Sequence, residues 1–238
     1  MQTAEQLLLN LRPRLDARLS DFDAPAYAGV LAAAGQLLDN PGSLLYLHGE
    51  SGHGRSHWLA ALCAEAECRG LSAVLLPLSE LCQEEPVMLA GLEAQDLIAC
   101  DDIEAVAGNV AWEEALFHLF NRARMNMCRQ VFSAVDAPGR CGIHLPDLVS
   151  RLAQAPAWVL GLPDDASRLA LTEASARRRG LVMEADVLRY LVLRAPREPG
   201  RLLALLEHLD RNSLVAGRRL TIPFIRQVLE VTSPGYAG

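Results

Sequence analysis

Residues Leu44–Trp58 read LLYLHGESGHGRSHW, an apolar run followed by a glycine-rich turn and the start of an apolar helical pattern. The apolar run, Leu44–Leu47, predicts a short buried strand, and the residues from Ser56 onward predict a helix. Between them the sequence matches the phosphate-loop pattern G-x-x-x-x-G-[KR]-[ST], with arginine where lysine is usual. A strand before the loop and a helix after it are the context in which this pattern binds phosphate.

The glycine-rich loop, Gly49–Ser56, has the chemistry that a nucleotide's phosphates require. Glycines let the backbone curl so that successive N–H groups point inward at an anion, and the next helix adds its positive end. We expect Arg55 to reach the outer phosphates and the Ser56 hydroxyl to ligate Mg²⁺. The alternative is a plain turn joining a strand to a helix. The predicted nucleotide contacts are Gly49, Glu50, Ser51, Gly52, His53, Gly54, Arg55, Ser56 and His57.

The composition of the 238 residues is that of a globular protein with a net charge of −7. This acidic balance argues against a broad basic face for duplex DNA. All 22 basic residues are arginine, so a bias against lysine could account for part of the loop's arginine. The six cysteines form no C-x-x-C pair, and we interpret them as reduced thiols. With no signal sequence and no bilayer-length apolar run, we expect a cytoplasmic protein without a membrane partner.

A second informative stretch, Asp96–Glu104, reads DLIACDDIE. Its apolar strand ends in two carboxylates, as the acidic strand of a phosphate-loop protein does. Asp101 would hold Mg²⁺, directly or through water, and Asp102 would orient or activate the attacking water. Asp136 follows the next predicted strand, Gln130–Ala134, where it could sense the terminal phosphate. The alternatives are a strand that ends in a polar turn and an aspartate in a turn.

Strand and helix signals alternate up to residue 162, which predicts a parallel sheet covered by helices on both faces. The five predicted strands lie near residues 44–47, 73–76, 96–100, 130–134 and 157–160. The first long helix is predicted over Phe22–Leu38. Beyond residue 163 only helices are predicted, near residues 167–179, 184–195, 199–216 and 222–231. We expect a loose tail over residues 233–238.

The first 20 residues have two interpretations. Gln6–Leu11 reads QLLLNL and is bounded by Pro13. The segment is either an amphipathic helix packed on the core or a short linear motif whose leucines enter a partner's hydrophobic pocket. The residues alone favour the packed helix, because short motifs match by chance so often.

Together these segments resemble the DnaA-like branch of the AAA+ proteins, and within it the DnaA-homologous regulators of bacterial replication initiation. The segments that carry the resemblance are GHGRSH at 52–57, LPDLVSRL at 145–152 and LTIPFIRQVL at 220–229. It implies a nucleotide-binding α/β domain over residues 21–162, built on a parallel five-stranded sheet. It also implies a small all-α lid domain over residues 163–232.

The resemblance implies roles for three polar residues. Arg151 matches the arginine finger, which reaches a neighbouring subunit's γ-phosphate. Arg201 matches the sensor 2 arginine, which contacts the chain's own nucleotide, and Asp136 matches sensor 1. For each arginine the alternative is a solvated surface charge. Ala137 departs from the pattern, because the family often has arginine there.

The N-terminal segment is similar to the family's motif for binding the DNA polymerase sliding clamp, which reverses the preference for a packed helix. The matching residues are Gln6, Leu7, Leu9 and Leu11. Asn10 stands where the motif often has proline, and Leu8 is more apolar than the residue usual at its position.

The resemblance implies a regulator that holds ADP and Mg²⁺, docks on the DNA-loaded clamp and stimulates hydrolysis of DnaA-bound ATP. We expect no sequence-specific DNA binding, and slow intrinsic hydrolysis because Asp102 is shorter than the glutamate of many AAA+ ATPases. One alternative is a stand-alone ATPase that loads or remodels a replication protein, and another is a module whose nucleotide is purely structural. The sequence leaves open ADP against ATP, homo-oligomer formation and the surface that meets DnaA.

Overall fold

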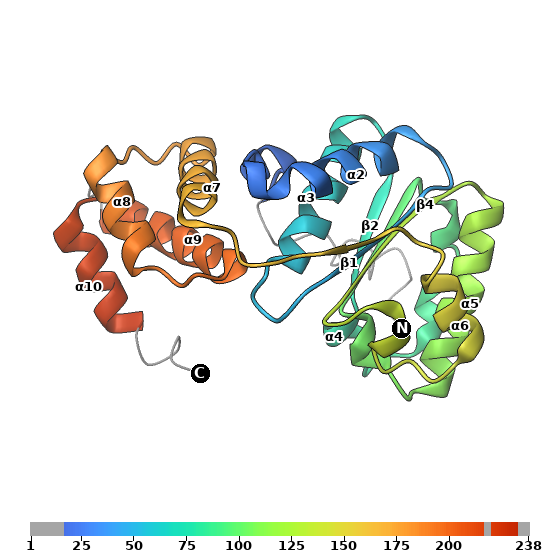
Figure 1. Cartoon of the computed structure of the whole chain (residues 1–238). Helices are drawn as coiled ribbons and strands as arrows, with labels where there is room; N and C mark the ends of the chain where they lie inside the picture. The colour runs from blue at the N-terminus through green and yellow to red at the C-terminus, as the bar shows by residue number, and fades with distance from the viewer. Residues whose placement is uncertain (1–16, 217–219, 233–238) are drawn as a thin grey trace. The chain divides into compact units, whose positions relative to one another are not determined.

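The computed structural model describes residues 17–216 and 220–232 (Figure 1). These residues form two compact units. The first unit comprises residues 17–19, 29–51 and 55–161, and the second comprises residues 20–28, 52–54 and the described residues from 162 onward. The predicted clamp motif and the predicted loose tail lie outside the described residues.

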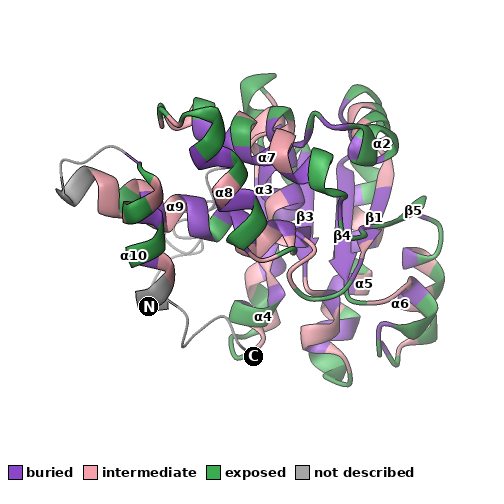
Figure 2. Cartoon of the chain, turned by 60° about the vertical axis from the view of Figure 1, so that its left-hand side comes forward, coloured by how far each residue is buried: buried purple, intermediate pink, exposed green. Residues whose placement is uncertain are grey.

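The first unit is built on a five-stranded parallel sheet, as predicted. The strand order is β2-β3-β4-β1-β5. The strands are β1 (Leu44–His48), β2 (Ala73–Pro77), β3 (Leu97–Asp101), β4 (Arg129–Ala134) and β5 (Ala157–Val159). Every residue of β3 and β4 is buried, because helices cover both faces of a parallel sheet. Figure 2 shows these buried strands between helices with exposed outer faces.

Five helices accompany this sheet within the described residues. They are α2 (Ala28–Asp39), α3 (Arg55–Cys68), α4 (Leu78–Leu81), α5 (Val110–Met125) and α6 (Pro146–Leu152). Helix α3 lies deepest, with residues Trp58–Cys63 all buried. Aromatic side chains from α5 and β4 meet in the core, where the rings of Phe120 and Phe132 stack 5.9 Å apart. None of the described helices has the length and apolarity needed to cross a membrane.

The prediction of one continuous helix over Phe22–Leu38 is wrong at its start. The segment forms two short 3-10 turns, η1 (Leu19–Phe22) and η2 (Pro25–Tyr27), before α2 begins at Ala28. The residue before a proline is pushed out of the helical region. Ala24 is accordingly extended, with φ −145° and ψ 150°.

The second unit contains four helices: α7 (Asp165–Arg178), α8 (Ala185–Arg194), α9 (Pro199–Ala216) and α10 (Ile222–Thr232). Leucines from α7, α8 and α9, including Leu171, Leu191 and Leu206, are fully buried between them. The Asp164 side chain caps α7 by accepting a hydrogen bond from the Ser167 amide at 2.8 Å. This all-helical region confirms the predicted change of pattern after the sheet.

Two buried charged side chains, Asp21 and Arg168, make ionic contacts within the second unit. Asp21, which is 1% exposed, receives hydrogen bonds from Nε and Nη2 of Arg178 at 3.0 and 2.9 Å. Arg168, 4% exposed, pairs with Asp165 and also donates to the carbonyls of residues 192, 195 and 196 at the end of α8. These carbonyls have no partner within their own helix, so Arg168 fastens α7 to the carboxyl end of α8.

We predict that Arg168→Leu destabilises the second unit by about 2–3 kcal/mol, because several buried carbonyls lose their donor. Urea unfolding followed by circular dichroism measures the change. Arg177→Leu is the matched control, since Arg177 lies on the same helix with its side chain 76% exposed. Equal stability of the two variants would contradict this role for Arg168.

Candidate functional site

The loops that follow β1, β3 and β4 meet at one edge of the sheet. The three strands are neighbours in parallel register, with His48 beside Ala134 and Cys100 beside Phe132. Parallel strands place their carboxyl ends at the same edge, which is where open α/β sheets bind ligands. The Asp101–Asp102 pair, Asp136 and the Arg55–Ser56 end of the glycine-rich loop therefore come together, as their positions after strands predict.

The glycine-rich loop requires glycine at two positions. Gly52 and Gly54 have φ values of 88° and 89°, a left-handed conformation that other residues rarely adopt. In the second unit these residues lie against the start of α9, where the Gly200 amide donates to the Gly52 carbonyl at 2.9 Å. A Cβ atom at Gly52 would come within 3.0 Å of the Glu198 Cβ. Close packing and backbone conformation both exclude a larger residue.

The same loop presents unused hydrogen-bond donors. Throughout the part of the chain that the structure describes, the amides of Ser51, Gly52 and Gly54 donate no hydrogen bond. The 14-residue helix α3 starts directly afterwards, at Arg55. Open amides next to a helix N-terminus suit an anion such as a phosphate group. The loop's conformation therefore fits the phosphates of a nucleotide.

Arg55 is paired with two carboxylates. Its Nη2 lies 3.0 Å from Oδ1 of Asp102 and its Nη1 lies 2.8 Å from Oε1 of Glu104. The Arg55 side chain is only 10% exposed. We expected Arg55 to reach the outer phosphates, and that contact stays a prediction; the structure adds an anchor at the end of β3.

The Asp101 carboxylate is buried at the end of β3 and hydrogen-bonded by two hydroxyls, those of Ser133 and Ser56. Burial, together with the negative charge of Asp102, raises the pKa of Asp101, although both hydroxyls and the Arg55 charge oppose the rise. No group of three or more His, Cys, Asp or Glu side chains is placed to hold a metal among the described residues. The Ser56 and Asp101 oxygens instead fit Mg²⁺, which takes few protein ligands and completes its shell with phosphates and water.

Asp102 is fixed by its backbone as well as by its partners. It has φ 56° and ψ 57°, a left-handed conformation uncommon for residues other than glycine. Its amide donates to Oγ of Ser133 at 3.1 Å, and its Oδ2 accepts from Oγ of Ser79 at 3.1 Å. With Arg55 on Oδ1, each carboxylate oxygen of Asp102 has one partner.

Glu104 is a site residue that the sequence argument missed. Its Oε1 accepts from Arg55 and from the Val135 amide, the latter at 3.0 Å. Its Oε2 is buried and has no hydrogen-bond partner in the described part of the chain. A third acidic residue after the aspartate pair was visible in the sequence. Glu104 lies in the 3-10 turn η5 (Ile103–Val106), and only the folded chain brings its carboxylate to Arg55.

Asp136 lies just past β4 and is about half exposed. Its carboxylate pairs with Arg140, whose Nε and Nη2 both lie 3.1 Å away. Its carbonyl accepts a hydrogen bond from the Tyr46 hydroxyl at 2.9 Å, which ties this turn to β1. The structure thus places Asp136 at the expected edge, with its side chain held by Arg140.

Arg151 lies in the last turn of α6 and is half-buried. Among the described residues its guanidinium has no hydrogen-bond or ion-pair partner. The loop before α6 is held by Glu113 of α5, which is 2% exposed. The Glu113 carboxylate accepts from the amides of Gly108, His144 and Leu145, at 2.6–3.1 Å. Arg151 is therefore a cation on a helix whose start is firmly anchored.

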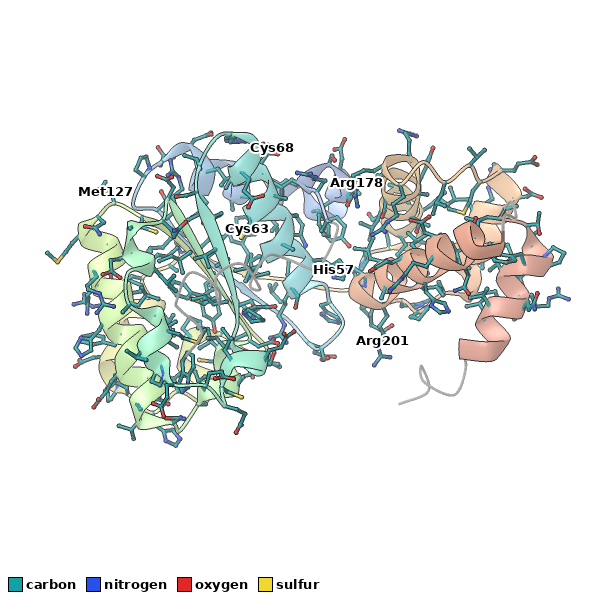
Figure 3. The ribbon with its side chains drawn as sticks, turned by 180° about the vertical axis from the view of Figure 1, so that it is seen from behind. His57, Cys63, Cys68, Met127, Arg178 and Arg201 are labelled. Carbon is teal, nitrogen blue, oxygen red and sulfur yellow. The ribbon has the colours of Figure 1, made fainter. Side chains whose placement is uncertain are left out.

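Arg201 belongs to the second unit, on α9 (Figure 3). Its Nη1 lies 3.4 Å from Oε1 of Glu198. Its Nε would lie 3.8 Å from a Cβ atom built on Gly52. Arg201 is thus next to the glycine-rich loop within its own unit, as a residue that contacts the phosphates should be.

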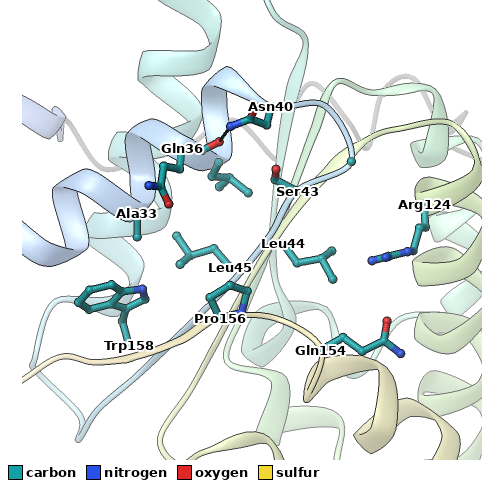
Figure 4. Close-up of a pocket in the computed structure, with 12 residues that line it drawn as sticks. Ala33, Gln36, Asn40, Ser43, Leu44, Leu45, Arg124, Gln154, Pro156 and Trp158 are labelled. Atoms are coloured by element: carbon teal, nitrogen blue, oxygen red, sulfur yellow. Dashed lines mark hydrogen bonds between the residues drawn. The ribbon is translucent and has the colours of Figure 1, made fainter.

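A pocket of about 530 Å³ opens at the other end of the sheet, beside the first residues of β1 (Figure 4). Leu44, Leu45 and Pro156 form its floor, with Trp158 on one side and Arg124 on the other. Because β1 runs from this pocket to the glycine-rich loop, the two features lie at opposite edges of the sheet. The pocket is therefore separate from the candidate site.

Comparison with known proteins identifies the second unit. Residues 164–229 match the family described as the Hda lid domain. This match covers helices α7 to α9 and most of α10. The second unit is thus similar to the lid domain of Hda.

Three solved structures show the same fold. Domain III of the replication initiation protein DnaA from Thermotoga maritima is 18% identical, with a TM-score of 0.75 over 90% of this chain and 95% of that one. AMPPCP-bound DnaA from Aquifex aeolicus is 19% identical, with a TM-score of 0.67 over 83% and 66%. The Holliday junction branch migration motor RuvB of Thermotoga maritima is 17% identical, with a TM-score of 0.62 over 93% and 72%. At these identities the likeness extends to the fold alone.

The Glu113 anchor should make stability depend on pH. Burial raises the pKa of Glu113, but hydrogen bonds from the amides of His144, Gly108 and Leu145 outweigh it and leave the pKa below its usual value. A carboxyl group with a lowered pKa stabilises the fold above its unfolded pKa of about 4.3. That stabilisation is lost as the pH falls through the folded pKa.

We predict that Glu113→Gln lowers the free energy of unfolding at pH 7 by about 1.5–3 kcal/mol. The difference from wild type should shrink as the pH falls below about 4. Urea unfolding at a series of pH values measures it. Glu114 is an exposed neighbour on the same helix, so Glu114→Gln should change neither the free energy of unfolding nor its pH dependence. A pH-independent difference between Glu113→Gln and wild type would contradict the charge-based account.

Proposed function

We propose that this protein binds an adenine nucleotide with Mg²⁺ and regulates replication initiation by stimulating hydrolysis of ATP bound to DnaA. The observation that carries the proposal is the hydrogen bond from Ser56, at the end of the glycine-rich loop, to the buried Asp101 at the sheet edge, in a chain with an Hda-type lid. The nucleotide analogue bound to the similar Aquifex aeolicus DnaA supports the nucleotide part.

Different residues would bind the phosphates and the Mg²⁺ ion of the nucleotide. The amides of Ser51, Gly52 and Gly54 would bind phosphate oxygens, and Arg201 would add positive charge from α9. Ser56 and Asp101 would hold Mg²⁺, which when bound neutralises phosphate charge and fixes the geometry of the phosphates. Mg²⁺ would offset the burial of the Asp101 carboxylate, whose charge is otherwise stabilised by two hydroxyls and Arg55.

We assign to Arg151 the contact with the ATP that DnaA holds. Its guanidinium is unpaired within the described chain, and it lies at the end of a helix whose start Glu113 anchors. A planar guanidinium on a rigid element suits a finger that stabilises negative charge on a neighbour's transferred phosphoryl group. ADP is the working ligand in this proposal, since the arginine then acts on ATP held by the other protein.

We predict that Arg151→Ala abolishes stimulation of DnaA's ATPase and leaves nucleotide binding by this chain unchanged. Loss of an arginine finger costs roughly 10³-fold or more in rate in GTPases. Hydrolysis of DnaA-bound ATP with clamp-loaded DNA is the measurement. Arg124→Ala is the control, because it removes an exposed arginine of the first unit that likewise has no partner among the described residues. Normal stimulation by Arg151→Ala would refute the assignment.

The N-terminal QLLLNL segment is proposed to tether the protein to the sliding clamp. We predict that the double variant Gln6→Ala, Leu9→Ala loses at least about tenfold in affinity for the clamp, because two pocket-filling side chains are removed. Surface plasmon resonance on immobilised clamp measures this. Nucleotide affinity should not change, and an unaltered clamp affinity would remove the motif from the proposal.

A further inference from the structure

The guanidinium group of Arg55 binds two carboxylates at once, one through each terminal nitrogen, and we call this arrangement the Arg55 fork. Nη2 binds Asp102 and Nη1 binds Glu104, at 3.0 and 2.8 Å. An arginine has five N–H donors in a fixed plane, whereas a lysine has one compact ammonium with three. Arginine can therefore hold both carboxylates at separate nitrogens, and lysine at this position cannot reproduce the geometry.

The Arg55 fork binds Asp102, the residue expected to orient or activate the attacking water. Both oxygens of Asp102 already accept from Arg55 and Ser79. Its left-handed backbone and its amide bond to Ser133 fix the direction of the side chain. A carboxylate neutralised by a guanidinium polarises a water molecule poorly, because the opposite charge favours its role as an ion-pair partner. Asp102 is held as a structural anion.

Glu104 keeps the fork in place. One oxygen, Oε1, accepts from both Arg55 and the Val135 amide, so Glu104 ties the arginine to the loop after β4. Arg55 is 10% exposed and Glu104 26% exposed, so water screens this pair only partly. Without the negative charge of Glu104, one arm of the fork loses its anchor and Arg55 is free to turn away from Asp102.

We propose that Glu104 is a positioning residue that, through Arg55, restrains Asp102 and so prevents hydrolysis of the chain's own nucleotide. The remaining N–H donors of Arg55 can still face a phosphate oxygen while the fork is in place. The restraint is therefore compatible with a bound nucleotide. The inference rests on the proposed function, because it presupposes nucleotide binding at this edge of the sheet.

The reaction that the restraint blocks is ordinary hydrolysis of the β–γ phosphoanhydride. The oxygen of a water molecule would bond to the γ-phosphorus while the bond from that phosphorus to the β–γ bridging oxygen breaks. One water proton would pass to the Asp102 carboxylate or to a phosphate oxygen, which leaves ADP and inorganic phosphate. A released Asp102 can orient this water, and a paired Asp102 cannot.

The test is single-turnover hydrolysis of Mg-ATP by the full chain in excess, without DnaA. We expect Glu104→Gln to raise the rate constant at least about tenfold, a part of the 10²–10⁴-fold that a positioned acid–base group supplies. Arg55→Lys should also raise it. Adding Asp102→Asn to Glu104→Gln should return the rate to the wild-type level or below. Glu80→Gln, which changes an exposed glutamate of the same unit, should leave the rate unchanged.

A fluorescent-nucleotide titration of each variant separates the possible failures. A Glu104→Gln variant that binds nucleotide but hydrolyses it at the wild-type rate overturns the restraint and leaves the proposed function intact. The restraint is also overturned if the higher hydrolysis rate of Glu104→Gln persists when Asp102→Asn is added. Loss of nucleotide binding by Glu104→Gln overturns it as well. A wild-type chain that binds no adenine nucleotide overturns both proposals.

Discussion

A buried carboxylate at the end of β3 is the constraint on which the candidate site depends. Asp101 is removed from water, and burying a charge without partners costs several kcal/mol. The Ser133 hydroxyl from β4, the Ser56 hydroxyl from α3 and the Arg55 charge supply those partners. Meeting this need draws the ends of β3 and β4 and the first turn of α3 into one cluster.

The same cluster determines what the neighbouring acids can do. Since Arg55 sits between Asp102 and Glu104, the residue expected to activate water is part of an ion-pair network. Such a network holds geometry well, because each member fixes the others. This geometry is the basis of the proposal that the chain holds its nucleotide without hydrolysing it.

The sheet domain and the lid domain differ in how much they indicate about the function of this protein. The sheet and its helices are shared with DnaA and with a branch migration motor, at 17–19% identity. A scaffold so widely reused does not determine a function. The lid is the informative part, because residues 164–229 match the Hda lid domain itself. Its buried pairs, Arg168 with the end of α8 and Arg178 with Asp21, stabilise that unit.

The sequence by itself determined the alternation of strands and helices, the parallel sheet and the all-helical region after it. These follow from local patterns: buried parallel strands are short apolar runs, and helices repeat their apolar positions every three or four residues. The sequence also predicted that the glycine-rich loop, Asp101 and Asp136 lie at one edge of the sheet, because each comes at the end of a parallel strand or directly after it. Pro25 is compatible with a helix start, but the residues from Pro25 to Tyr27 form a 3-10 turn before α2 begins at Ala28.

Only the tertiary structure decided the partners of the charges. The contacts of Arg55 with Glu104, of Glu104 with Val135 and of Glu113 with His144 join residues that lie 31 to 49 positions apart. Acidic residues are common on exposed surfaces, and nothing in their spacing distinguishes a solvated glutamate from a buried one. That distinction depends on which backbone amides and guanidinium groups the fold brings within hydrogen-bonding distance, and this is fixed only when strands distant in sequence pair side by side.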